Sequence, residues 1–260
     1  MKKILFIFFS SYIMLNINCA QKIKKKTVLS KKAYKKFFNA CKKGNIKSLK
    51  IFVNKGIDIN AMNKDKPLIG EMTGLMYASR NGHLDIVKFL LLNGANIDAQ
   101  NRNRYSKGFT SKITPLMYAC KKGHRKIVEL LINNGAKINL YDSGKRTALI
   151  YACINGNIDI VKYIISKSSS FLYDCNNYTP LKIAAYHGHY KIVKYLLSKN
   201  FNCKSHALLE AVKSNKYKIV KYLLFKGVSI KNQIGEKALI SAVNYGYFKL
   251  VKLLISNGLS

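Results

Sequence analysis

Apolar residues recur along most of this chain in two short alternating patterns, each with helical spacing. The first is a run that includes small residues, such as Leu116 to Cys120 (LMYAC). The second is an Ile-Val-x-x-Leu-Leu stripe, such as Ile86 to Leu91 (IVKFLL), which places its apolar side chains on one side of a helix. The sequence therefore predicts short helix–loop–helix units, with each stripe buried in a core.

The two patterns recur together seven times, and every copy aligns on one central position. That position is occupied by Gly44, Gly82, Gly123, Gly156, Gly188, Asn215 and Gly246. Glycine, and asparagine to a lesser degree, adopts the left-handed backbone that turns the chain between helices. One unit cannot bury its apolar side alone, so stacked units must share a continuous core.

Phrases at both ends of the unit resemble the ankyrin repeat, a motif of about 33 residues. Thr114 to Leu116 and Thr179 to Leu181 read Thr-Pro-Leu, and Asn93 to Asp98 reads NGANID. The histidine that follows Thr-Pro-Leu in the family is replaced at every copy, by Met76, Met117, Ile150 and Lys182. The resemblance implies an all-α ankyrin-repeat solenoid of stacked helix-loop-helix repeats with projecting hairpin loops.

The chain before the repeats has the pattern of a secretory signal. Met1 to Lys3 is basic, and Ile4 to Leu15 is an apolar run that is shorter than the ~20 residues needed to span a bilayer. We expect a signal peptide at 1–20, a basic tether at 21–32 and an ankyrin-repeat domain at 33–260. Its repeats are expected near 33–61, 70–100, 112–140, 145–173, 177–203, 205–231 and 235–260.

Processing of the predicted signal peptide has two alternatives. Cys19 directly after the apolar run resembles the lipid-modified cysteine of bacterial lipoproteins, although Leu15 lies one position too early for the usual pattern. Ordinary cleavage after Cys19 or Ala20 is the other. We expect a bacterial protein that is exported to the periplasm or cell envelope, lipid-anchored there through Cys19, or secreted. If the run is not a signal, the protein is cytoplasmic or a host-directed effector.

The chain is unusually basic, with 46 Lys and Arg residues against 11 Asp and Glu residues and a net charge of +35. Such a field attracts anionic partners in a salt-dependent way. A compositional bias of the genome would favour Lys over Arg, but it does not explain the scarcity of Asp and Glu. Both explanations therefore remain open.

The cysteines and histidines point to packing rather than to chemistry. Cys41, Cys120 and Cys153 occupy one repeat position, which the other copies fill with Ser79, Ala185, Val212 and Val243. We expect this position to lie in the core. The odd number of cysteines after Cys19 argues against a disulfide framework, and no Cys-x-x-Cys indicates a metal site. His83, His124 and His189 follow the central glycine and are expected to bond neighbouring loops. We expect no cofactor, no metal and no enzymatic activity.

Two loops before first helices carry extra residues, within Met62 to Met72 and within Asn101 to Lys112, and a third is shortened around Asn202 to His206. Insertions on one side of a solenoid often mark its binding face. The Asn101 to Lys112 loop mixes cations with aromatics, which are frequent interface anchors. The candidate partner-binding residues are Arg102, Arg104, Tyr105, Lys107, Phe109 and, in the fifth loop, Tyr178. The alternative is a tolerated insertion without a role.

These features favour a monomeric protein-interaction scaffold that holds an acidic protein partner on its concave face and finger loops. An electrostatic binder of polyanions or of an anionic membrane surface is the alternative, because a ladder of lysines follows the second helices. That ladder consists of Lys88, Lys162, Lys194, Lys221 and Lys252. Specific nucleic-acid recognition is not expected.

Overall fold

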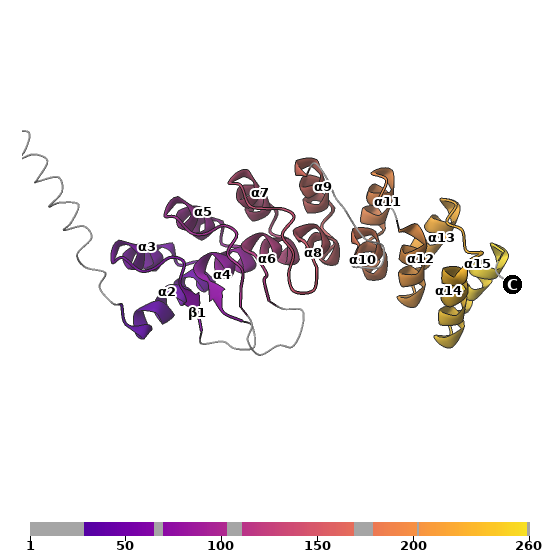
Figure 1. Ribbon diagram of the computed structural model, residues 1–260, viewed down its shortest axis with the longest axis horizontal. Coiled ribbons are helices and arrows are strands. Elements are labelled where there is room, and N and C mark those ends of the chain that lie inside the picture. Colours follow the sequence, from indigo (N-terminus) through magenta and orange to yellow (C-terminus); the bar gives the residue numbers. More distant parts are fainter. Residues whose placement is uncertain (1–28, 65–69, 103–110, 169–178, 202, 259–260) are drawn as a thin grey trace, which may run out of the picture.

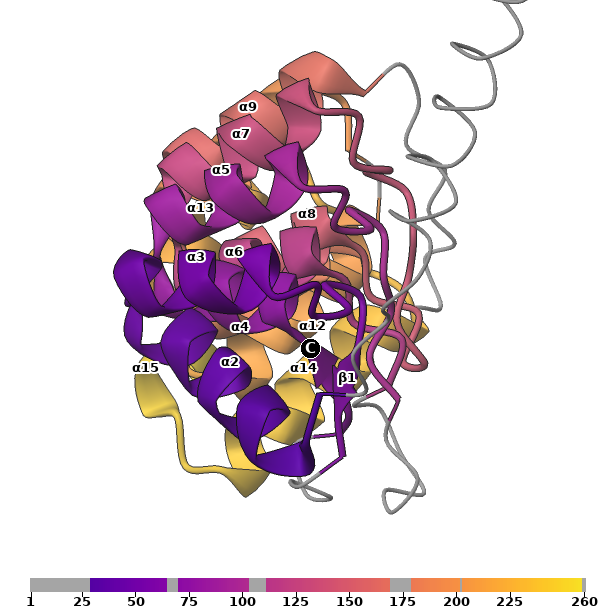
Figure 2. The same cartoon turned by 90° about the vertical axis from the view of Figure 1, so that its left-hand side faces the viewer.

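A computed structural model describes residues 29–64, 70–102, 111–168, 179–201 and 203–258. The described residues form fourteen helices in seven pairs, stacked side by side in two layers (Figure 1). Viewed along the stack, the connecting loops gather on one side of the helices (Figure 2). The predicted all-α solenoid with loops projecting to one side is confirmed.

Each pair contributes one helix to each layer, and each helix packs on its counterpart in the next pair. The first helices are α2 (Lys31–Lys43), α4 (Gly74–Asn81), α6 (Pro115–Lys122), α8 (Ala148–Asn155), α10 (Pro180–His187), α12 (Lys204–Lys213) and α14 (Gln233–Asn244). The second helices are α3 (Ile46–Asn54), α5 (Leu84–Leu92), α7 (Arg125–Asn133), α9 (Ile158–Lys167), α11 (Tyr190–Ser198), α13 (Tyr217–Phe225) and α15 (Phe248–Ser256). Strands β1 (Met62–Asn63) and β2 (Met72–Thr73) pair antiparallel in the second loop.

Threonine caps begin four of the first helices. The Thr114 hydroxyl accepts a hydrogen bond from the Met117 amide at 3.3 Å, and Pro115 occupies the first turn of α6. Thr73, Thr147 and Thr179 act in the same way. The first helix differs from the prediction, because α2 is capped by Ser30 and begins at Lys31, inside the range expected to be tether.

The central glycines turn the chain and also make room for the next repeat. Gly82 has φ 84°, and a Cβ atom built there would lie 2.7 Å from the ring of His124. That ring reaches back to hydrogen bond with the Arg80 carbonyl at 3.1 Å. His83 bonds in the same way to the Lys42 carbonyl at 2.8 Å. The expected histidine bonds between loops are thus confirmed, and each requires glycine beneath the ring.

The core runs without interruption through all seven pairs. Cys41, Cys120 and Cys153 lie fully buried in it, as expected. The prediction was wrong for Val243, which is 57% exposed, since α14 has no first helix packed on its outer side in the part of the chain described. None of the described helices has the length and apolar character needed to cross a membrane.

One cysteine forms a disulfide, although the sequence argues against a disulfide framework. Cys203 is disulfide-bonded, and its partner lies outside the described residues, because Cys41, Cys120 and Cys153 are free. Cys203 has φ 75° and caps α12 without a side-chain hydrogen bond. This is the repeat whose shortened loop lacks the usual threonine.

We predict that the three core thiols react only after unfolding. Burial raises the pKa of Cys41 to about 12 and raises the pKa of Cys120 and of Cys153 as well. At pH 8 the native protein should therefore carry almost no thiolate at these positions. Mass spectrometry after iodoacetamide treatment should find all three alkylated in denaturant and none in buffer. Rapid alkylation of the native protein at any of them would contradict this.

Candidate functional site

Backbone hydrogen bonds join the bases of the second, third and fourth loops, which we call the finger bases. The Glu71 amide donates to the Arg102 carbonyl at 2.6 Å, and the Arg102 amide donates back at 3.2 Å. The Ser143 amide donates to the Ser111 carbonyl at 3.0 Å, and the two serine hydroxyls also bond. The finger bases therefore form one connected surface rather than separate loops.

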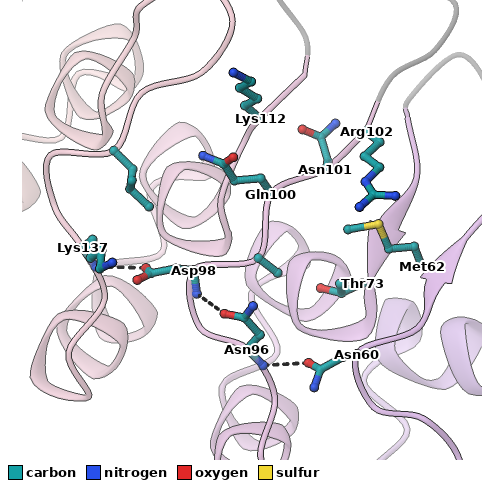
Figure 3. A pocket seen from close by; sticks show the side chains of 12 residues that line it. Asn60, Met62, Thr73, Asn96, Asp98, Gln100, Asn101, Arg102, Lys112 and Lys137 are labelled. Atoms are coloured by element: carbon teal, nitrogen blue, oxygen red, sulfur yellow. Dashed lines mark hydrogen bonds between the residues drawn. The ribbon is translucent and has the colours of Figure 1, made fainter.

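A cavity of about 570 Å³ opens beside the finger bases (Figure 3). Hydrogen bonds between successive repeats line one wall. The side-chain oxygen of Asn60 accepts from the backbone amide of Asn96 at 2.7 Å, and the Asp98 carboxylate accepts from the backbone amide of Lys137 at 3.0 Å. Arg102 and Lys112 supply exposed cations from the opposite side. The cavity can thus receive a carboxylate or another polar group from a partner.

Of the predicted binding residues, the structure places Arg102 at this cavity. The other candidates, Arg104, Tyr105, Lys107, Phe109, Tyr178 and Cys19, lie outside the described residues. Asn101, at the start of the Asn101 to Lys112 loop, is buried and has a structural role. It is 1% exposed, and its side-chain oxygen accepts the Ile113 amide at 2.7 Å. Asn101 therefore closes the base of the loop.

A second feature escaped the sequence analysis. Lys42, Arg80 and Lys121 stand two residues before the central glycine in three successive repeats. Arg80 lies over the ring of Tyr118, 6.0 Å from its centroid, and Lys121 lies 5.5 Å from the centroid of Tyr151. Each of these two cations thus rests on a tyrosine of the following repeat. Such cation–π contacts hold the cations in position.

Arg146 extends this series, which we call the cation row: Lys42, Arg80, Lys121 and Arg146. Its guanidinium lies 5.2 Å from the Tyr151 centroid and pairs with the fully buried carboxylate of Asp142 at 2.8 Å. The Tyr151 hydroxyl donates to the same carboxylate at 2.6 Å. Burial raises the pKa of Tyr151, and this hydrogen bond raises the pKa further. Asp142 therefore organises both Arg146 and Tyr151.

The cation row is electrostatically crowded. Burial is the main cause that lowers the pKa of Lys121, and the positive charges of Arg146 and Arg80 lower it further. Burial also raises the pKa of Tyr118 to about 12, which keeps this phenol neutral beneath Arg80. A bound anion would relieve the repulsion among the cations. Alignment on the central glycine could have found Lys42, Arg80 and Lys121, but it could not have found Arg146.

Among the described residues, no group of three His, Cys, Asp or Glu side chains could hold a metal ion. The candidate site consists of two surfaces that carry exposed cations, the finger-base cavity and the cation row.

The comparisons with known proteins agree with this architecture. A family model of ankyrin repeats (3 copies) matches residues 15–101, 37–142, 75–172, 116–207 and 200–260. The chain belongs to the ankyrin-repeat family. Ankyrin repeats generally serve as protein-interaction modules and not as enzymes. A search of curated proteins returned no match.

Proposed function

We propose that this protein is an exported scaffold that binds an acidic protein partner through its concave face and finger loops. The observation that carries the proposal is the connected surface of the finger bases. Arg102 and Lys112 stand exposed at its cavity, and backbone hydrogen bonds to neighbouring repeats hold their loop. A binding surface fixed before the partner arrives loses little entropy on association.

Export has separate support. The basic start at Met1 to Lys3 and the apolar run at Ile4 to Leu15 have the order of a secretory signal. Disulfides persist mainly in oxidising compartments outside the cytosol, so the disulfide at Cys203 fits an exported protein. Mass spectrometry of the native N-terminus would identify the cleavage site and any lipid on Cys19.

We predict that shortening the third loop abolishes capture of the partner. Residues 103–110 are replaced by Asn-Gly, a two-residue hairpin turn, so that Asn101 and its bond to Ile113 remain. Partner recovery from an envelope extract, quantified by mass spectrometry at two salt concentrations, should fall at least about tenfold through loss of the loop's anchors. Far-UV circular dichroism checks that the helix stack is intact.

A matched control removes charge without touching the loop. The pair Lys218→Gln and Lys221→Gln, on exposed positions of α13, should leave recovery of a specific partner nearly unchanged. A general binder of polyanions would give a different result. Partner recovery would then be unchanged in the loop-shortened variant, reduced in the α13 variant and much lower at the higher salt concentration.

A further inference from the structure

Three members of the cation row, Lys42, Arg80 and Lys121, lie along the stack at equivalent positions of the first three repeats, and Arg146 follows them in the fourth loop. Lys42 and Lys121 are exposed and Arg80 is half-buried. Asp142 is the carboxylate whose charge acts on Lys121, and it already pairs with Arg146 and accepts the Tyr151 hydroxyl. The row therefore presents a regular positive surface, and the carboxylate that acts on Lys121 is already paired.

The surface changes character beyond the row. The position equivalent to Lys121 is Ile154 in the fourth repeat and Tyr186 in the fifth, where Tyr186 is 48% exposed. In the sixth repeat it is Lys213, which pairs with Glu210 at 3.7 Å. The positive surface is thus followed by the apolar side chains of Ile154 and Tyr186 and does not continue along the whole solenoid.

The distance between equivalent positions in neighbouring repeats favours one backbone conformation of a bound peptide. Packed helices lie about 8–10 Å apart, so cations at equivalent positions recur at about this spacing. A polyproline II segment has three residues per turn and rises ~3.1 Å per residue, about 9.3 Å per turn. It therefore returns a side chain to the same side at nearly the repeat distance. In a β-strand, successive side chains point to opposite faces, so residues three positions apart lie on opposite sides. A strand therefore cannot present every third side chain to the cation row.

We propose that the cation row binds an acidic segment of the partner protein in polyproline II conformation, with an acidic side chain at every third residue. The inference rests on the proposed scaffold function and specifies the chemistry of its partner. An apolar residue beside the acidic run would lie against Ile154 and Tyr186. Tyr118 and Tyr151 hold the cations in place before binding, which limits the entropy that binding costs.

Two synthetic peptides of equal composition test the register. One has four Glu-Pro-Pro triplets, and the other has four contiguous Glu residues followed by eight Pro residues. Both carry fluorescein, and anisotropy is measured with the full chain at about 0.15 M salt. The periodic peptide should bind about fivefold more tightly, because more of its carboxylates can face a cation at once. Equal affinity would overturn the proposal and indicate a general polyanion surface.

A charge-matched pair of variants locates the site. Arg80→Gln with Lys121→Gln should weaken the periodic peptide about tenfold and remove the preference between peptides. Lys191→Gln with Lys194→Gln removes the same charge from the exposed side of α11 and should keep the preference. An equal loss in both variants would contradict the assignment to the row.

Crosslinking of the unaltered protein tests the site without substitutions. Carbodiimide coupling should join glutamates of the periodic peptide to the amines of Lys42 and Lys121, identified by mass spectrometry of the digest. Coupling confined to Lys191 and Lys194 would overturn the proposal. If the peptide fails to bind while shortening the third loop still abolishes partner capture, the inference fails and the scaffold function stands. If the peptide binds but no partner depends on the loop, the scaffold function fails.

Discussion

Replacement of Asp142 by alanine should lower the free energy of unfolding by about 3 kcal/mol, because it removes one partner of a buried ion pair. Four hydrogen bonds end on this carboxylate, from the Gly144 amide, the Arg146 amide, the Arg146 Nε and the Tyr151 hydroxyl, and a second guanidinium nitrogen of Arg146 forms an ion pair with it. Alanine would leave the hydroxyl of Tyr151, which is 1% exposed, without its acceptor. The turn of the fourth loop would lose its organising group.

Urea denaturation followed by circular dichroism measures this loss, and hydrogen exchange localises it to α8 and the fourth loop. Localisation matters because long repeat arrays can unfold in segments. Asp159→Ala in the same repeat is the control, since its side chain is 57% exposed and its contact with Arg125 is 3.6 Å. It should change stability by less than about 0.5 kcal/mol. Similar effects of the two substitutions would refute the role assigned to Asp142.

Replacement of Gly235 by alanine should destabilise the last helix pair by about 3 kcal/mol through overpacking. Gly235 is buried in the first turn of α14, and a Cβ atom there would lie 1.8 Å from the Ile230 carbonyl oxygen. The clash is with backbone, so no side-chain rotation can remove it. The Asn232 side chain, which accepts the Gly235 amide at 2.9 Å, would be displaced with the turn.

Hydrogen exchange should show faster opening of α14 and α15 and unchanged protection of α6 to α9. Gly227→Ala is the matched control. Gly227 has φ 72°, but nothing lies within 4 Å of an added Cβ atom. Its cost should be only the backbone strain of about 1 kcal/mol. If α14 loses no more protection in the Gly235→Ala variant than in the Gly227→Ala control, the turn before α14 can relax to accept the Cβ atom and the prediction is wrong.

Features that depend on neighbours in sequence were predictable from the chain alone. The Thr114 cap acts on an amide three residues away, and the left-handed turn at Gly82 needs only the absence of a Cβ atom. Asn215 adopts φ 55°, because asparagine tolerates the left-handed conformation better than most residues that carry a Cβ atom. The helices therefore begin and turn near the positions that the sequence indicates.

Two features that depend on what packs around a residue in the folded chain differ from the sequence pattern. Val243 follows the core pattern and is exposed, because burial requires a neighbour on its outer side. Asn101 has the sequence context of an exposed loop and is buried, because its side chain bonds to the far end of that loop.

The cation row shows the same division. Alignment of the repeats places Lys42, Arg80 and Lys121 at one position, but it cannot show the rings beneath two of them. The sequence by itself determined the repeat, its caps and turns, and the excess of positive charge, since these follow from local spacing and composition. Only the stacked structure decided where that charge gathers, because Arg80 lies over Tyr118 and Lys121 lies over Tyr151 across the boundary between repeats.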